Sequence, residues 1–476
     1  MHDLKIESGR PAAGELVVAS PYDGRELERV PTAGPDHVED AMSVAYGLFR
    51  DRHTWLSIPE RVEILGKAAA IMGSQVEELT MLAASEGGKP YADSKVEVIR
   101  AIDGVHLCIE NLRGHPGAVI PLGTTQATVG RAAFTQKEPV GVVVAVSAFN
   151  HPLNLIVHQV GPAVATGCPV VVKPAADTPL SCLRFVEILH EAGLPEAWCQ
   201  AVITEDRETA EKLVTDPRVG FFSFIGSARV GWMLRSKLAP GARCALEHGG
   251  AAPVILAPPY DMDAVVPSVS KGGFYHAGQV CVSVQRVFVP AADAEAFAGK
   301  LADSAKSLVV GAPEEPATEV GPLIRTAEVD RVAEWVDEAV SAGASLICGG
   351  KKISDTCYEP TVLLNPPADA KVSSLEIFGP VVCIYGYDDV DAAVEKANAL
   401  PVAFQAAVFS QDIDTAMRLY KLLDASAVMI NDHSAFRDDA MPFAGLRESG
   451  LGVGGIPYTM EDMQVDKMMV IKSESL

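Results

Sequence analysis

Continuous apolar runs of strand length constrain the fold of this chain more than any other feature of its sequence. After Pro139 the segment GVVVAVSAF, residues 141–149, is almost entirely apolar, and PVVVK follows at residues 169–173. Side chains of a strand alternate between two faces, so such a run indicates a strand buried on both faces, as in a parallel sheet. The runs alternate with segments of helical periodicity, and this order predicts a doubly wound α/β sheet. The expected helices cover residues 155–165, 180–192 and 210–214, and further strands cover residues 199–203 and 219–224.

Polar residues and glycines stand where these strands end. Asn150, Lys173 and the pair Gly226-Ser227 each end or follow a strand. Ligands of open α/β sheets bind outside the carboxyl ends of the strands. Gly226 and Gly231 also flank an expected helix start, where backbone N–H groups favour a phosphate. Their spacing departs from GxGxxG, so a nucleotide site and a plain glycine turn both remain open.

An acid and a thiol follow in the segment from residue 245 to residue 286. Glu247 precedes His248-Gly249-Gly250, and Cys281 ends the tetrapeptide GQVC. A carboxylate that acts as a base and a thiol that attacks are the two parts of a covalent mechanism. Taken singly, a cysteine is more often a small buried hydrophobe and a glutamate a solvated charge.

The rest of the chain adds extended and helical segments around this centre. Residues 16–30 indicate two short strands around a Tyr-Asp-Gly turn, residues 35–110 are helical in periodicity, and residues 127–137 form an extended ribbon. A second α/β unit is expected beyond Cys281. The last strand, residues 467–472, has no expected neighbour, so it would pair with an external sheet edge in an oligomer.

Composition excludes several classes of function. The chain has 476 residues, enough for two or three domains, and its net charge of −23 opposes binding to a nucleic-acid backbone. No apolar run is long enough to cross a bilayer, and no basic and apolar leader is evident. The nine cysteines are scattered without a CxxC pair, which favours a cytoplasmic protein without disulfides or a metal site.

Seven motifs in one order make the chain resemble aldehyde dehydrogenases over essentially its whole length. Cys281 follows Glu247 by 34 residues, as the base and the nucleophile do in that family. The motifs are Asn150, Lys173, Gly226-Ser227, Glu247, Cys281, Glu376-Ile377-Phe378-Gly379-Pro380 and MPFAGLRESGLG at residues 441–452.

The resemblance implies an aldehyde dehydrogenase fold of class α/β. A Rossmann-like domain that binds NAD or NADP would comprise residues 1–115 and 139–249, and an α/β catalytic domain would comprise residues 250–455. Residues 116–138 and 456–476 would form a small β arm through which a homodimer or homotetramer assembles.

The resemblance also implies a covalent reaction. Cys281 would attack the aldehyde and form a thiohemiacetal, whose oxyanion the Asn150 amide and the Cys281 N–H would stabilise. Loss of hydride to the cofactor would leave a thioester on Cys281. Glu247 would then activate the water that releases the acid. The sequence leads us to expect that the thiolate forms near neutral pH.

Cofactor contacts carry over from the family position by position. Lys173 would bind the adenosine ribose, and Ser227 the pyrophosphate. Gly226 and Gly231 would allow close approach of the backbone to the pyrophosphate. Gly250 would leave room for the nicotinamide ring. Glu376 would bind the nicotinamide ribose, and Phe378 would pack beside Glu376. The family often has Glu at the position of Ala176, where it would repel a 2′-phosphate; both cofactors are therefore open, with NAD favoured.

Three basic residues at positions that line the family's aldehyde tunnel suggest an anionic substrate. They are Arg100, His151 and Arg437, with Phe443 as a further lining residue. Guanidinium groups suit a carboxylate, phosphonate, phosphate or sulfonate. The alternative is that the arginines are surface residues paired with carboxylates. The segments around residues 148–154 and 431–460 are also similar to phosphonoacetaldehyde dehydrogenases, so phosphonoacetaldehyde is the first expected substrate.

Other functions remain open. Within the family these are a lactaldehyde, glyceraldehyde 3-phosphate or semialdehyde dehydrogenase, and a CoA-acylating enzyme, whose members generally lack a Glu at the position of Glu247. Outside enzymes, a non-catalytic protein on the same fold would require loss of Cys281, Glu247 or Asn150, all of which are present.

Overall fold

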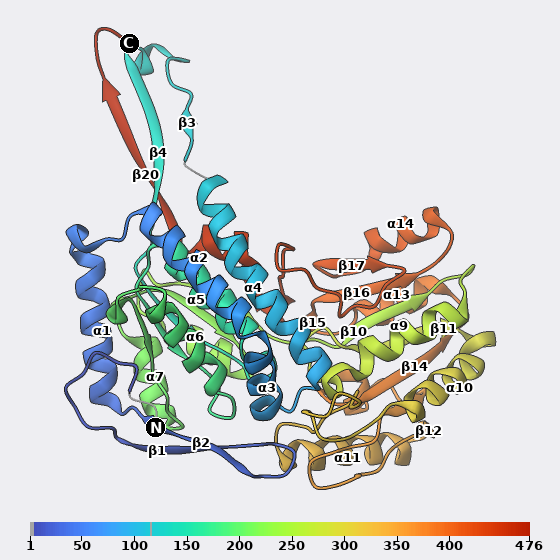
Figure 1. The fold of residues 1–476 in the computed structure, drawn as a ribbon. Helices are drawn as coiled ribbons and strands as arrows, with labels where there is room; N and C mark the ends of the chain where they lie inside the picture. The colour runs from blue at the N-terminus through green and yellow to red at the C-terminus, as the bar shows by residue number, and fades with distance from the viewer. Residues whose placement is uncertain (1–3, 115–116) are drawn as a thin grey trace.

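Two mostly parallel sheets form the centres of the two halves of the molecule (Figure 1). The computed structural model describes residues 4–114 and 117–476. The first sheet has the order β19-β9-β8-β5-β6-β7, and the second β12-β13-β14-β11-β10-β16-β17. The strands of the first sheet are β5 (Val142–Val146), β6 (Val170–Lys173), β7 (Cys199–Ala201), β8 (Val219–Ile225), β9 (Arg243–Glu247) and β19 (Gly450–Leu451). Those of the second are β10 (Ala252–Leu256), β11 (Val284–Pro290), β12 (Ser345–Cys348), β13 (Thr361–Leu364), β14 (Val381–Tyr387), β16 (Gln405–Phe409) and β17 (Ala427–Ile430).

Apolar side chains cover both faces of the first sheet, as the continuous runs predicted. Along β5, Val143 and Ala145 enter one core cluster, whereas Val142 and Val144 enter another on the opposite face. The predicted doubly wound α/β sheet is therefore confirmed. The helices of this half are α1 (Pro35–Arg50), α2 (Ile58–Ser74), α3 (Val76–Gly87), α4 (Tyr91–Gly114), α5 (Asn154–Thr166), α6 (Leu180–Glu191), α7 (Arg207–Thr215) and α8 (Ala228–Arg235).

The second sheet is covered in the same manner. Alternate residues of β10, such as Val254 and Ile255, belong to different core clusters. Its half contains α9 (Met262–Phe274), α10 (Ala291–Ser307), α11 (Thr326–Ser341), α12 (Lys371–Ser374), α13 (Val390–Asn398) and α14 (Ile413–Leu422). Two short antiparallel pairs are β1 (Gly14–Ala19) with β2 (Glu26–Thr32), which confirms the predicted pair, and β15 (Val402–Ala403) with β18 (Leu446–Arg447).

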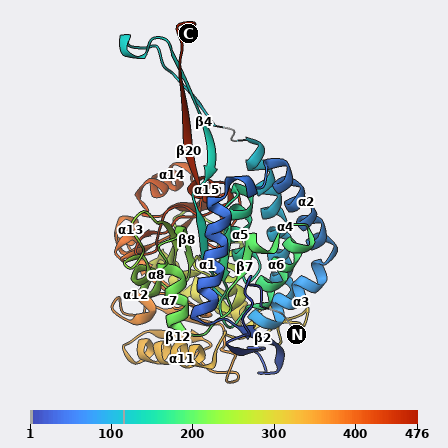
Figure 2. The same cartoon turned by 90° about the vertical axis from the view of Figure 1, so that its left-hand side faces the viewer.

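A long antiparallel arm projects from the two sheets (Figures 1 and 2). Its strands are β3 (Val119–Ile120), β4 (Arg131–Pro139) and β20 (Gln464–Lys472), in the order β20-β4-β3. The prediction that the last strand lacks a partner within its own chain was wrong, because β20 pairs with β4 along its whole length, from Gln464 to Lys472. Apolar side chains along the arm nevertheless stay exposed, among them Val119, Met468 and Ile471.

The domain bounds stay a prediction. The boundary expected at residues 115 and 116 lies outside the described residues, as do residues 1–3. One strand of the expected catalytic range, β19, pairs with β9 and thereby joins the first sheet. No helix in the described ranges is long and apolar enough to cross a membrane.

Candidate active site

Glu247 is the last residue of β9, so its side chain stands at a carboxyl end of the first sheet. Its carboxylate lies against Gly454, where an added Cβ would come within 2.1 Å of Oε1. Burial raises the pKa of Glu247 to about 7, although the positive charge of Arg437 acts in the opposite direction. A carboxyl group with a pKa near the working pH is suited to accept and return a proton.

Cys281 follows a strained turn that comes after α9. His276 and Ala277 have φ angles of 49° and 53°, which are unusual for residues with a side chain. At Gly278, with φ of 70°, an added Cβ would lie 2.1 Å from the Gly379 carbonyl oxygen. The turn is therefore fixed against the segment that carries Glu376, and such strain is typical of functional sites.

Burial raises the pKa of the Cys281 thiol well above its ordinary value. The carboxylates of Glu376 and Glu247 act in the same direction, and Arg437 opposes them. The expectation that the thiolate forms near neutral pH is therefore not met by this arrangement. Attack by the thiol requires a base to remove its proton. Glu247 is a candidate for this base, because its charge acts on the pKa of the Cys281 thiol.

The Asn150 side chain is hydrogen-bonded to the loop that carries Cys281. Its side-chain amide is buried and donates a hydrogen bond to the Gln279 carbonyl oxygen at 2.9 Å. Gln279 in turn donates to the Pro322 carbonyl at 3.1 Å and accepts from the Ile324 N–H at 3.0 Å. An amide group has two hydrogens, so Asn150 retains one donor for an oxyanion.

Glu376 has a buried oxygen without a partner. Oε1 is enclosed and makes no hydrogen bond with the described residues. Burial raises the pKa of Glu376 to about 8, although the hydrogen bond from the Gly250 N–H and the charge of Arg331 act to lower it. Since buried polar atoms are almost always hydrogen-bonded, this oxygen fits an acceptor of ligand hydroxyl groups, such as those of a ribose. Gly249 leaves the room that the carboxylate occupies, because an added Cβ would lie 1.6 Å from Oε1.

Lys173 is the last residue of β6, and Ser227 follows β8. These strands lie on either side of β5, so both residues stand at the same edge of the first sheet. Among the described residues, the Lys173 ammonium donates to the Pro174 carbonyl alone, at 3.2 Å, and burial lowers its pKa. Ser227 is the N-cap residue of α8, yet its hydroxyl does not cap the helix. Both groups therefore have donors available for a ribose or a phosphate.

The glycines expected around the cofactor differ in what they contact. The atoms nearest to a Cβ on Gly226 would be those of the Phe224 ring, at 2.9 Å, and a Cβ on Gly250 would make ordinary contacts with Phe404 and Ser449. Gly231 instead makes room for His248, whose Cε1 would lie 2.1 Å from an added Cβ. This differs from the expectation of an approach to a pyrophosphate, because a ring of the protein fills the space.

Phe378 packs against Phe149, the residue before Asn150. The two rings meet edge to face with centroids 5.9 Å apart, and Phe378 has a φ angle of 49°. This contact joins the Glu376 segment to the Asn150 segment.

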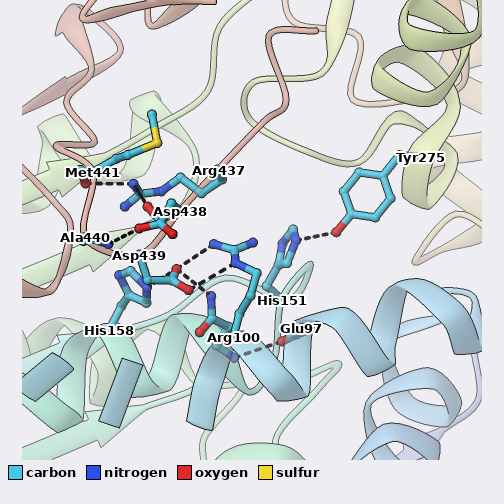
Figure 3. A network of polar contacts seen from close by, with 11 residues as sticks. Glu97, Arg100, His151, His158, Tyr275, Arg437, Asp438, Asp439, Ala440 and Met441 are labelled. Carbon is cyan, nitrogen blue, oxygen red and sulfur yellow. Dashed lines mark hydrogen bonds and ion pairs between the residues drawn. The ribbon is translucent and has the colours of Figure 1, made fainter. Parts of the chain in front are cut away.

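Arg100 lies in a buried polar network on the side of the site formed by α4 and α5 (Figure 3). Its Nε and Nη2 donate to the two carboxylate oxygens of Asp439 at 3.1 and 2.6 Å. Asp439 also accepts from His158 Nε2 at 2.7 Å and Asn154 Nδ2 at 3.3 Å. The alternative of a carboxylate partner thus holds for Arg100, although the pair is not at the surface: the Asp439 side chain is 4% exposed.

Arg437 has no carboxylate within ion-pair distance among the described residues. Its Nη1 donates to the carbonyl oxygens of Asp438 and Met441, the latter at 2.7 Å (Figure 3). The guanidinium stacks over the Phe443 ring, 4.5 Å from its centroid, and its charge affects the pKa of both Glu247 and Cys281. Arg437 is therefore a cation beside the candidate nucleophile and base, and the alternative of carboxylate pairing fails for it.

His151 and Phe443 complete the predicted substrate residues. The His151 Nε2 forms a hydrogen bond of 2.9 Å with the Tyr275 hydroxyl, and burial holds the pKa of His151 well below its ordinary value. Phe443 is buried in an apolar cluster that also contains Phe404 and Cys281. His151 is therefore a neutral polar group at neutral pH rather than a cation.

Comparison with known proteins decides the family. The sequence pattern of the "Aldehyde dehydrogenase family" matches residues 10–469. The chain belongs to the aldehyde dehydrogenase family. The predicted fold and the predicted aldehyde-oxidising enzyme class are confirmed at this level.

Relatives of the chain act on several small aldehydes. A 3-sulfolactaldehyde dehydrogenase of Priestia aryabhattai is 37% identical over 96% of this chain and 95% of its own length. Aldehyde dehydrogenase 21 of Physcomitrella patens, solved with the reaction product succinate, is 34% identical with a TM-score of 0.92, over 96% of this chain and 95% of its own. Glyceraldehyde-3-phosphate dehydrogenase of Methanocaldococcus jannaschii, solved with NADP, is 32% identical with a TM-score of 0.91, over 96% and 99%.

Several residues around this aldehyde dehydrogenase site had no signal in the sequence. Asp439 stands in a loop, His158 and Asn154 lie on the buried helix α5, and Gly249 and Gly454 are two of forty glycines. Their contacts join segments remote in the chain. Only the family motifs beside them, Glu247-His248-Gly249 and residues 441–452, could have drawn attention to these positions.

Gly249→Ala should weaken cofactor binding more than it weakens the fold. The methyl group would occupy the position of the Glu376 carboxyl group, so that the ribose would lose this hydrogen-bond acceptor. We expect KM for NAD or NADP to rise about 10- to 100-fold. Gly299→Ala is the matched control, because an added Cβ there meets no atom within 4 Å. An unchanged cofactor KM in the Gly249 variant would contradict the assignment of Glu376.

Proposed function

We propose that this chain oxidises a small anionic aldehyde to its carboxylic acid with NAD or NADP. The observation that carries the proposal is Arg437, whose guanidinium lies beside Cys281 and Glu247 without a carboxylate partner among the described residues. A half-buried guanidinium with free N–H donors favours a carboxylate, sulfonate, phosphonate or phosphate.

The residues of the site support a reaction in two stages. Cys281 attacks the aldehyde carbon, the thiol proton leaves to a base, and Asn150 donates to the oxyanion of the thiohemiacetal. Bound NAD or NADP supplies the acceptor for hydride. The resulting thioester on Cys281 is then hydrolysed by a water molecule that Glu247 deprotonates, and the same carboxyl returns the proton to the thiolate.

The residues fit a dinucleotide but leave its choice open. Glu376, Phe378 and Gly250 would hold the nicotinamide ribose and ring. Lys173, Ser227 and Gly226 would bind the adenosine half, whereas Gly231 makes room for His248. Ala176 carries no charge that would repel a 2′-phosphate, and it packs partly buried against the first core cluster. We favour NAD, with NADP as the alternative.

Phosphonoacetaldehyde is the compound that the sequence suggests first. The names of relatives add three candidate substrates: 3-sulfolactaldehyde, lactaldehyde and glyceraldehyde 3-phosphate. A CoA-acylating activity is less compatible with the buried Glu247, and a product assay with and without CoA separates the two. A non-catalytic role is disfavoured by the presence of Cys281, Glu247 and Asn150 at one site.

Arg437→Gln should remove the preference for anionic over neutral aldehydes. The variant loses the charge that would face the substrate anion, so kcat/KM for an acidic aldehyde should fall about 10- to 100-fold. The value for propionaldehyde should change little. Arg52→Gln serves as a control, since Arg52 also stacks on an aromatic ring, that of Trp55 at 4.6 Å, and its guanidinium donates to Glu138 in the arm strand β4. If both aldehydes lost activity equally, the anionic substrate would be refuted.

We further propose a homodimer or homotetramer that assembles through the arm. The exposed apolar side chains of β20 and the free outer edge of that strand support this assembly. A cytoplasmic location is consistent with nine free cysteines.

A further inference from the structure

We infer that the site selects its anionic substrate by charge number, and that it prefers a singly charged sulfonate or carboxylate to a doubly charged phosphonate or phosphate. The inference rests on the proposed function, since it concerns the same pocket. It follows from the way in which the charged groups around Cys281 are paired with one another.

Arg100 and Asp439 form a neutral unit. Two N–H groups of the guanidinium face the two oxygens of the carboxylate, which is the bidentate geometry of a strong ion pair. Asn154 and His158 donate to the same carboxylate, so three side chains from the two helices α4 and α5 satisfy its charge. Burial acts to raise the pKa of Asp439, but His158 and Arg100 together hold it well below its ordinary range, so the carboxylate stays ionised at neutral pH. The charge of Arg100 is therefore already balanced by the protein.

Two other cations on this side of the site are balanced in the same manner. Lys89 is fully buried and pairs with Glu97, and Lys271 pairs with Asp93 at 2.6 Å. His151 contributes no charge at neutral pH, because burial and the nearby charge of Lys89 lower its pKa. Within the described part of the chain, this leaves Arg437 as the cation near Cys281 with no carboxylate in ion-pair contact, although Asp439 and Glu247 act on it from further away.

A substrate with one negative charge therefore finds one matching cation. A second negative charge would have to give up its hydration without a counter-ion, which is costly in a buried site. Glu247 adds to this cost whenever it is ionised, since it is close enough to Arg437 for the two to interact. The bidentate pair thus limits the positive charge that is offered to the substrate, and Asp439 acts as a specificity-determining residue that need not touch it.

Matched aldehydes test the inference on the purified full-length enzyme. Sulfoacetaldehyde and phosphonoacetaldehyde share a two-carbon skeleton, and at about pH 8 a phosphate-type group, with its second pKa near 6, carries close to two charges. We expect kcat/KM for the sulfonate to exceed that for the phosphonate by about tenfold or more. Equal values, or a preference for the phosphonate, would overturn the inference while leaving an anionic substrate intact. If propionaldehyde matched both compounds, the proposed function itself would fail.

A charge cycle at the pair distinguishes charge from damage to the fold. Asp439→Asn leaves Arg100 unbalanced, so the ratio of phosphonate to sulfonate kcat/KM should rise about tenfold. Arg100→Gln leaves Asp439 unbalanced and should lower the ratio, and the double variant R100Q/D439N should return it toward the starting value. Ratios are compared within each variant, so a uniform loss of activity does not affect them. Single variants that shift the ratio in the same direction would contradict the inference.

Discussion

Cys281→Ala should abolish aldehyde oxidation and leave cofactor binding intact. The variant removes the atom that forms the covalent bond to the substrate, and no other thiol stands beside Glu247 and Asn150 in the described structure. We expect kcat to fall about 10³-fold or more, as when a covalent nucleophile is lost. The measurement is reduced cofactor formed from an acidic aldehyde, together with a fluorescence titration of NADH.

Cys244→Ala is the matched control for this experiment. Cys244 lies on β9, three residues before Glu247, and is a partly buried free thiol like Cys281. Its loss should leave turnover close to that of the unmodified enzyme. Residual turnover of the Cys281 variant at a comparable rate would refute the assignment of the nucleophile.

Glu247→Gln should stop the reaction after the first chemical stage. Without the carboxylate, water attacks the thioester slowly, so steady-state turnover should fall about 10²- to 10⁴-fold. Rapid mixing with aldehyde should still give a burst of about one reduced cofactor per subunit, because hydride transfer precedes hydrolysis. Acid quenching followed by mass spectrometry should find the acyl group on Cys281.

The pH dependence of hydrolysis gives a second measure of the same residue. The base must be ionised to accept a proton, and burial raises the pKa of Glu247 to about 7. Turnover limited by hydrolysis should therefore increase with pH below about 7 and level off above it, and Glu247→Gln should lose this inflection. If the burst also disappeared in the variant, Glu247 would be needed earlier, as the acceptor of the thiol proton that the raised pKa of Cys281 requires.

The sequence predicts the parts of this enzyme that depend on local pattern. The alternation of Val142–Val146 between two core clusters follows from an apolar run of strand length. Contacts between distant segments are a different matter, since no periodicity encodes them. The carboxylate of Asp439 binds Arg100, which lies 339 residues away in the chain. Likewise, the His248 ring occupies the space beside Gly231. The sequence therefore singled out Arg100 as a candidate but not its partner Asp439.

The final strand was misjudged for the same reason. An isolated apolar segment at residues 467–472 gives no sign of which edge it joins, and the answer, β4, lies more than 300 residues earlier. Domain bounds and residue roles follow from family likeness rather than from geometry, and they remain predictions.

The contact between Glu247 and Gly454 has a mechanical consequence. Gly454 exchanges two backbone hydrogen bonds with Phe443, at 2.9 and 2.7 Å, and residues 455–463, mostly the helix α15 (Ile456–Asp462), lead from it directly into β20. Gly454, which lies behind the Glu247 carboxylate, and the start of β20 are thus the two ends of one short segment. A neighbouring subunit that pairs with the outer edge of β20 would restrict the motion of this segment. Quaternary structure would then affect how precisely Glu247 positions the hydrolytic water.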